Sequence, residues 1–169
     1  KDRKGFISTS RLVPAKRVDV LVQAATTLGV PLTVISTGPE MARLTRMAGP
    51  TVTFTGYVSD EAVADQVAHA AAFLFASFDD FGIVPVEAMA AGTPVIAYKA
   101  GGALDYVVPG KTGLFFEEQT PESLIKALRS FDPHSFKPDV VRAGAEKFSP
   151  QVFTHSMSQL IAAALKNNK

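Results

Sequence analysis

The segment most informative about the fold is Ala72-Phe73-Leu74-Phe75-Ala76, followed after two residues by Asp79-Asp80-Phe81-Gly82-Ile83-Val84-Pro85-Val86-Glu87. A strand that is apolar at every position is typical of a parallel sheet that is covered on both faces. Pro85 suits the first position of a helix, because its missing N–H costs nothing there. The stretch therefore predicts a strand, a loop and a helix in succession, with Glu87 in the first helical turn.

Strand-like and helix-like runs alternate along the chain in the same way. The expected strands are Gly5–Ser10, Leu32–Ser36, Val52–Thr55, Ala72–Ala76, Pro94–Ala97 and Gly113–Phe116. The expected helices are Val18–Leu28, Pro39–Met47, a helix that Ser59 or Asp60 caps and that ends at His69, Pro85–Ala91, Ala103–Val107, Pro121–Ser130 behind the cap Thr120, Pro138–Lys147 and Pro150–Lys166. Repeated strand-helix-strand units predict an α/β, Rossmann-like, doubly wound parallel sheet with helices on both faces. We expect residues 1–169 to form a single domain.

Composition excludes several classes of protein. The net charge is +1, which gives no overall electrostatic case for a nucleic-acid partner. The chain has no cysteine, so disulfides, thiolate metal sites and a cysteine nucleophile are excluded. No apolar run is long enough to suggest a membrane span. The start Lys1-Asp2-Arg3-Lys4 lacks an apolar signal region and an initiator Met, and we interpret it as a cut from a longer protein.

Ligands of open α/β sheets bind beyond the carboxyl ends of the strands, so the residues that follow each strand carry the functional signal. These residues are Ser10-Arg11, Thr37-Gly38, Gly56-Tyr57, Ser77–Gly82 and Lys99–Gly102. Arg11 and Lys16 follow the first strand, and an Arg fork together with a Lys point charge suits a diphosphate. Ordinary surface charges on a solvated loop are the alternative interpretation of this pair.

The carboxylates Asp79 and Glu87 lie eight positions apart. Glu87 either complements the helix dipole or accepts hydrogen bonds from paired hydroxyls, as on a ribose. Asp79 would accept from the hydroxyls of a second sugar. Adjacent Asp79 and Asp80 have no third hard ligand nearby in the sequence, so we expect no metal site.

Five motifs occur in an order that resembles a known family. They are Ile7–Lys16, Thr37–Glu40, Phe54–Val58, Phe81–Gly92 and Gly110–Gly113. Together they resemble the C-terminal, donor-binding domain of retaining glycosyltransferase family 4 enzymes, which have the GT-B fold. The variant Asp80-Phe81-Gly82-Ile83, with Lys16-Arg17, is similar to the mannosyltransferase branch, which suggests GDP-mannose as the donor.

The resemblance implies roles at matching positions. The implied catalytic set is Arg11 and Lys16 on the nucleotide diphosphate, Glu87 on the ribose and Asp79 on the donor sugar. The implied nucleotide-binding set is Tyr57 and Val58 around the base, the backbone of Gly82, Ile83 and Val84, and also Gly38 and Phe81. Asp79 stands where glutamate is usual, which shortens its reach, and Ser10 stands where glycine is common.

The resemblance also implies a hexosyltransferase that uses no cofactor and no metal. The expected partners are a nucleotide-sugar donor, a missing N-terminal acceptor domain that the final helix would contact, and a glycan or lipid-linked acceptor, with no nucleic acid. We expect a cytoplasmic protein, peripheral at the inner face of the membrane when complete, and an isolated domain that transfers nothing. A non-catalytic nucleotide-sugar-binding module and one half of a GT-B sugar-nucleotide epimerase are the alternatives.

Overall fold

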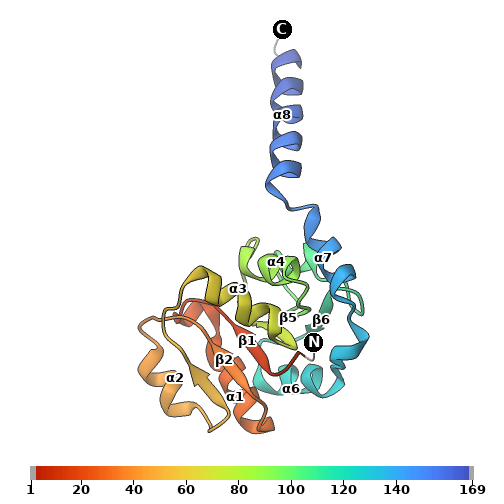
Figure 1. Ribbon diagram of the computed structural model, residues 1–169. Helices are drawn as coiled ribbons and strands as arrows, with labels where there is room; N and C mark the ends of the chain where they lie inside the picture. The colour runs from red at the N-terminus through yellow and green to blue at the C-terminus, as the bar shows by residue number, and fades with distance from the viewer. Residues whose placement is uncertain (1–2, 168–169) are drawn as a thin grey trace.

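The computed structural model describes residues 3–167, so Lys1 and Asp2 of the expected cut terminus lie outside the described residues. The strands are β1 (Phe6–Ser8), β2 (Leu32–Val34), β3 (Val52–Phe54), β4 (Ala72–Phe75), β5 (Val95–Tyr98) and β6 (Gly113–Phe116). The α-helices are α1 (Val18–Leu28), α2 (Met41–Met47), α3 (Asp60–His69), α4 (Ile83–Ala90), α5 (Ala103–Tyr106), α6 (Pro121–Ser130), α7 (Pro138–Glu146) and α8 (Pro150–Asn167). Short 3-10 turns, η1 (Pro14–Lys16) and η2 (Pro133–Ser135), complete the described elements (Figure 1).

The six strands form one parallel sheet in the order β3-β2-β1-β4-β5-β6. Strand β1 pairs with β2 on one side and with β4 on the other, where Phe6 lies opposite Ala72 and Ile7 opposite Phe73. The chain thus builds outward from β1 in one direction and then returns to build in the other. The junction of β1 and β4 is the point at which the strand order reverses.

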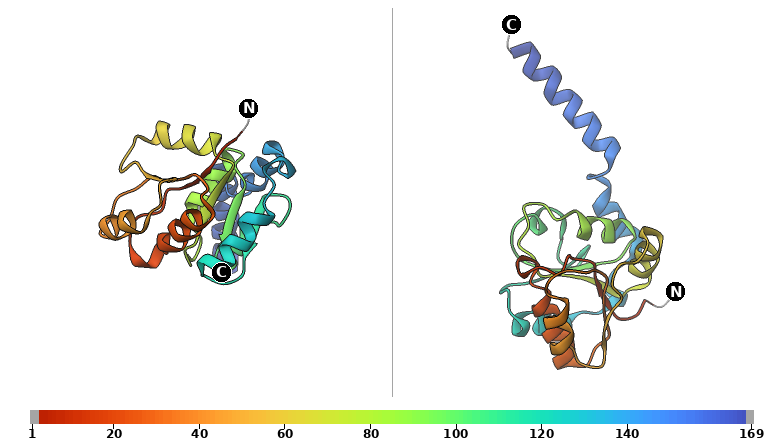
Figure 2. Two further views of the ribbon diagram at one scale, coloured as in Figure 1. Left: turned by 90° about the horizontal axis from the view of Figure 1, so that it is seen from below. Right: turned by 90° about the vertical axis from the view of Figure 1, so that its left-hand side faces the viewer.

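Helices cover both faces of the sheet, as predicted, and each face has its own apolar core (Figures 1 and 2). Strand β4 is fully buried because its alternate side chains enter opposite cores, Leu74 with α1 and α6, and Phe73 with α3, α4 and α7. The predicted caps are confirmed, since Ser59 Oγ accepts from Ala62 N at 3.4 Å and Thr120 Oγ1 from Ser123 N at 3.3 Å. The α/β fold class is therefore confirmed.

The start of α4 differs from the prediction. The helix begins at Ile83 behind the N-cap Gly82, so Pro85 is its third residue and Glu87 lies beyond its first turn. Proline fits there because the first four N–H groups of a helix have no partner within it. The proline signal alone was therefore compatible with a start two residues earlier. Likewise α2 begins at Met41 rather than Pro39, because Glu40 N donates to Leu12 O in another loop at 3.1 Å.

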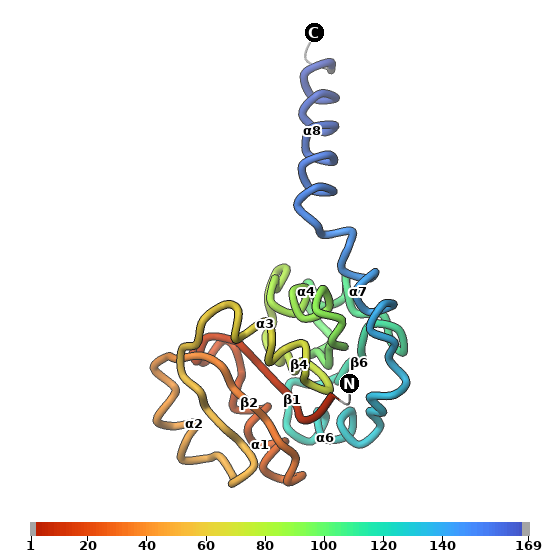
Figure 3. The backbone as a smooth tube through the Cα atoms, viewed as in Figure 1, coloured from red at the N-terminus to blue at the C-terminus, as the bar shows by residue number. Residues whose placement is uncertain are grey.

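Helix α8 projects away from the body formed by the sheet and the other helices (Figure 3). Its apolar side chains Val152, Phe153, Met157, Leu160 and Ile161 are all exposed. The spacing of these residues is that of one helix face. Exposed apolar side chains on one face indicate a surface that another structure covers.

Candidate functional site

The candidate site lies at the carboxyl ends of β1 and β4, where the strand order reverses. Ligands of doubly wound sheets bind at such a switch point. The loop after β1 leads through η1 to Lys16, and the loop after β4 leads through Asp79 to the start of α4. Two segments that are 63 residues apart in the sequence are thereby brought together at Lys16 and Asp79.

Lys16 and Asp79 bind each other directly. Lys16 Nζ lies 2.7 Å from Asp79 Oδ1 and 2.6 Å from Oδ2, so it contacts both carboxylate oxygens. The Lys16 and Asp79 side chains are 29% and 22% exposed, so the pair is partly shielded from water. Fully buried Ser77 donates from its Oγ to Asp79 Oδ1 at 2.5 Å. We call Lys16, Ser77 and Asp79 the switch-point cluster.

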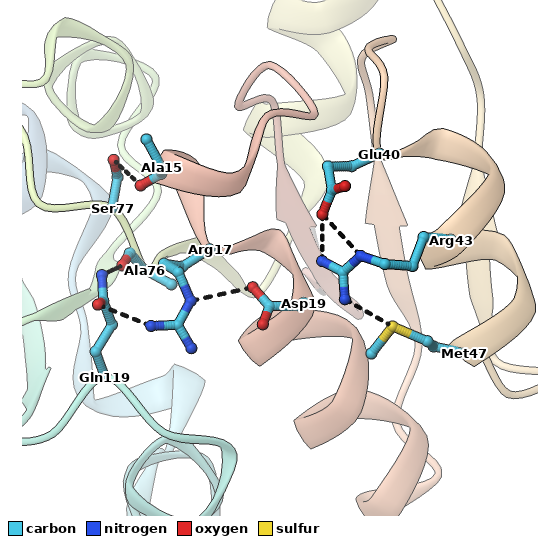
Figure 4. A network of polar contacts seen from close by, with 9 residues as sticks. All are labelled: Ala15, Arg17, Asp19, Glu40, Arg43, Met47, Ala76, Ser77 and Gln119. Carbon is cyan, nitrogen blue, oxygen red and sulfur yellow. Dashed lines mark hydrogen bonds and ion pairs between the residues drawn. The ribbon is translucent and has the colours of Figure 1, made fainter.

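A polar network fixes the backbone on the Lys16 side (Figure 4). Arg17 has φ of 49°, and it is the one non-glycine residue of the described chain with a left-handed backbone. Its guanidinium donates to Asp19 Oδ1 at 3.2 Å and to Gln119 Oε1 at 3.0 Å, while Gln119 Nε2 donates to Ala76 O at 2.7 Å. A strained backbone of this kind persists only where its surroundings hold it. The network therefore ties the end of η1 to the end of β4.

The Asp79 side is fixed through the loop after β5. Gly102 N donates to Asp79 O at 2.9 Å, and a Cβ at Gly101 would collide with the same carbonyl. Only glycine allows such a close approach of two backbones, and Gly101 also has positive φ. The loop Lys99–Gly102 thus supports the position of Asp79.

Arg11 and Gly38 lie where the loops after β1 and β2 cross. Leu12 N donates to Thr37 O at 3.2 Å, and a Cβ on Gly38 would collide with Leu12 O. This contact explains glycine at position 38 without a ligand, so a nucleotide role for Gly38 stays a prediction. Arg11 is exposed beside the crossing. Ser10, where glycine is common in the family, is buried.

A pocket of about 420 Å³ lies between α3 and α4. Its lining is mostly apolar and consists of Asp60, Val63, Ala64, Val67, Phe73, Val84, Glu87, Ala88 and Ala91. Of the predicted site residues, Val84 and Glu87 line this α3–α4 pocket, whereas Arg11, Lys16 and Asp79 do not. Glu87 is exposed, so its carboxylate is available to a ligand. The predicted carboxylates Asp79 and Glu87 therefore lie in two separate regions.

An aromatic cluster supports the start of α4. Phe81 packs edge-on against Tyr106 and Phe148, with ring centroids 5.9 and 5.2 Å apart. A Cβ on Gly82 would lie 2.9 Å from Tyr106 Oη, and Gly82 has φ of 77°, so glycine is required there. Tyr106 is buried, and its hydroxyl has no hydrogen-bond partner among residues 3–167. Burial, and then the charges of Asp79 and Asp105, raise the pKa of Tyr106.

The remaining predicted residues lie near the edges of these regions. Tyr57 is 84% exposed in the loop before α3, while Val58 packs against the core on the α3 and α4 face. Ile83 is exposed at the first position of α4. The predicted segment Ser77–Gly82 contains Ser77 without a role of its own, and the predictions include neither Gln119 nor Tyr106. Ser77 directly follows the predicted strand Ala72–Ala76 and lies two residues before Asp79, so its position in the sequence indicates a place at the site.

The described residues lack both a metal-binding cluster and a membrane-spanning helix. Residues 3–167 contain no cluster of three or more His, Cys, Asp or Glu side chains that are placed to hold a metal ion. In the same range no helix has both the length and the apolarity that crossing a membrane requires. The expectation of a reaction without a metal stays a prediction.

Comparison with known proteins places this geometry in a family. Residues 1–134 match the family described as "Glycosyl transferases group 1". A GDP-mannose-dependent alpha-mannosyltransferase of Mycobacterium tuberculosis is 36% identical over 126 residues, which cover 71% of this chain and 32% of that protein. A GDP-mannose-dependent alpha-(1-6)-phosphatidylinositol monomannoside mannosyltransferase of the same species is 33% identical over 147 residues, or 75% of this chain and 38% of that protein.

A solved structure supports the same placement. Sucrose-phosphate synthase from Thermosynechococcus elongatus superposes with a TM-score of 0.86 at 26% identity, covering 98% of this chain and 46% of that chain. The chain thus spans about a third of the curated relatives and under half of this structure. The resemblance drawn from the motifs is confirmed: the chain belongs to the group 1 glycosyl transferase family.

Proposed function

We propose that this chain is the nucleotide-sugar donor-binding domain of a retaining hexosyltransferase, with GDP-mannose as the donor. The observation that carries the proposal is the meeting of Lys16 and Asp79 at the switch point, beside the start of α4. A cation and a sugar-binding carboxylate at one place match the two adjoining parts of a nucleotide sugar. The names of the two mycobacterial relatives supply the choice of GDP-mannose.

The diphosphate lies at the switch point in this proposal. Arg11 and Lys16 bind its oxygens, and the backbone N–H groups of Gly82, Ile83 and Val84 add donors at the positive end of the α4 dipole. These groups stabilise the negative charge that builds on the leaving nucleoside diphosphate as the glycosidic bond breaks. The chain's own donors suffice for this role, so we propose that no metal takes part.

The nucleoside lies along the α3–α4 pocket. Glu87 accepts hydrogen bonds from the two ribose hydroxyls, and the apolar wall that includes Val84 accommodates the ribose and the edge of the base. Tyr57 and Val58, in the loop before α3, contact the base. Asp79 accepts from hydroxyls of the hexose.

The acceptor belongs to a second domain. The curated relatives are much longer than this chain, and α8 carries an exposed apolar face. We propose that an N-terminal domain covers this face and binds a glycan or lipid-linked acceptor, with the complete enzyme in the cytoplasm at the inner face of the membrane. Transfer then requires both domains.

Calorimetric titration of this chain with GDP, UDP, ADP, GDP-mannose and UDP-glucose tests the proposal. We expect one of the nucleoside diphosphates and its sugar derivative to bind at a single site. Failure of all five to bind the folded chain would refute the donor-binding role. For the complete protein, release of free nucleoside diphosphate with a 2-epimerised sugar would identify an epimerase instead.

A further inference from the structure

We propose that the ion pair between Lys16 and Asp79 makes the site distinguish a complete nucleotide sugar from the free nucleoside diphosphate. Lys16 leaves Asp79 for the phosphates when either ligand binds. Only the complete donor brings hydroxyls that replace Lys16 on the Asp79 carboxylate. This inference rests on the proposed function, because it assumes that a diphosphate binds beside Lys16.

The contacts of Asp79 show what the exchange removes. Its carboxylate receives both Oδ contacts of the Lys16 ammonium and one hydrogen bond from Ser77. Once Lys16 has turned to a phosphate, Ser77 is the one remaining donor among these contacts. A carboxylate with 22% exposure that loses its cation is only partly compensated by water.

The surroundings favour exchange by side-chain rotation. A side-chain hydrogen bond from Arg17 to Gln119 and a backbone hydrogen bond from Gly102 to Asp79 hold the segments on either side of the pair. Lysine has a flexible stem and a compact charge, so its ammonium can change partner while its backbone stays in place. If the Lys16 side chain could not rotate, its contact with Asp79 would keep the ammonium away from the diphosphate.

The contribution of Asp79 to the binding free energy therefore has opposite signs for the nucleoside diphosphate and for the nucleotide sugar. Free nucleoside diphosphate takes Lys16 and leaves Asp79 short of donors, which weakens its binding. A nucleotide sugar takes Lys16 and supplies hydroxyl donors to Asp79, which restores the lost interactions. The pair thereby favours the substrate over the product that the reaction leaves behind.

The test compares Kd values for GDP and GDP-mannose, or for the matching pair that the titration above identifies, in wild-type chain and in Asp79→Asn. The variant keeps the shape of residue 79 and removes its charge. We expect GDP to bind about two- to fivefold more tightly, because Lys16 is no longer held by a charge. We expect GDP-mannose to bind more weakly. The Kd for GDP divided by the Kd for GDP-mannose should therefore fall about tenfold.

Asp80→Asn is the matched control, since it removes the same charge from the exposed neighbouring residue. It should leave the Kd ratio unchanged. An unchanged ratio in Asp79→Asn overturns the inference while the donor site stands. Absence of binding by any nucleotide in the wild type overturns the donor site and the inference together.

A second measurement needs no variant. The 15N resonance of the Lys16 ammonium, assigned by its loss in Lys16→Met, should shift when inorganic pyrophosphate is added to the wild-type chain. Pyrophosphate supplies the diphosphate without a sugar, so it isolates the step in which Lys16 leaves Asp79. Pyrophosphate binding with no change at this resonance overturns the exchange.

Discussion

The predicted site residues bind each other in the switch-point cluster, whereas the one carboxylate among those that line the α3–α4 pocket is exposed beside open space. In the switch-point cluster the charged groups bind each other, with Lys16 on both oxygens of Asp79. In the pocket, Glu87 is exposed beside a hollow of about 420 Å³ with mostly apolar walls. One region must exchange contacts to receive a ligand, and the other has space ready.

Because of this difference, we expect the two regions to contribute differently to the affinity for a ligand and to the selectivity between ligands. A preformed apolar pocket gains affinity by burying ligand surface without breaking contacts. A cluster whose polar groups are already paired gains only the difference between old and new partners. We therefore expect the pocket to provide most of the affinity and the cluster to provide discrimination between ligands.

The largest effect should come from Phe73→Ala, which breaks both regions at once. Phe73 is fully buried on β4, lines the pocket, and belongs to the strand that leads to Ser77 and Asp79. Removal of a buried phenyl ring costs about 3–5 kcal/mol of unfolding free energy. Urea unfolding checks this, with the same change at exposed Phe78 as the control. Equal losses in the two variants would contradict the structure.

Lys16→Met should separate the regions by damaging the cluster alone. Loss of the cation should weaken nucleoside diphosphate binding by about 1.5–3 kcal/mol, the range for a charged hydrogen bond. The unfolding free energy should fall by less than about 1 kcal/mol, since the pair keeps some solvent access. Titration and urea unfolding measure the two effects. Lys126→Met, at an exposed position of α6, is the control and should leave binding intact.

Glu87→Gln tests the pocket in the same way. The change keeps shape but replaces one acceptor oxygen with a donor, so nucleotide binding should weaken by about 1–3 kcal/mol. The unfolding free energy should stay within about 0.5 kcal/mol of the wild type, because Glu87 is exposed. Separate titrations with a nucleoside and with inorganic pyrophosphate show which part of the ligand Glu87 contacts. The variant should bind the nucleoside more weakly and pyrophosphate as tightly as the wild type does. Unchanged nucleotide affinity removes Glu87 from the site.

Tyr106→Phe should have the smallest effect, and it should raise the unfolding free energy instead of lowering it. It removes a buried hydroxyl that has no partner among the described residues, so the unfolding free energy should rise by about 1 kcal/mol. The pKa of Tyr106 is raised by burial, so above about pH 10 the folded chain keeps a proton that the unfolded chain loses. Wild-type stability should therefore fall as the pH rises above about 10, and the variant should lose less.

Urea unfolding at pH 7 and across pH 9–11 measures the Tyr106 effect. Tyr98→Phe, at the half-buried end of β5, is the control. A loss of stability in Tyr106→Phe at pH 7 would show that the hydroxyl has a partner in solution.

Local patterns were enough to predict most elements of the fold. Helix α1 and strand β6 have the predicted bounds, and Ser59 and Thr120 act as the predicted caps. Alternation of strands with helices predicted the parallel sheet. The predicted start of α4 was wrong by two residues, because proline is tolerated throughout the first turn of a helix. The observed start behind Gly82 depends on the close approach of Tyr106 and Phe75 to that glycine.

The sequence alone was enough to establish the α/β class and the family and to predict the residue types of the candidate site, because hydrophobic periodicity and motif order can be read along the chain. Three relations could be seen only in the folded chain: Lys16 binds Asp79, Ser77 and Gln119 support the pair, and Glu87 lines a separate pocket. Those relations depend on the meeting of β1 and β4 and on the packing of α3 against α4. Contacts between distant segments form only when the sheet brings their loops to one edge.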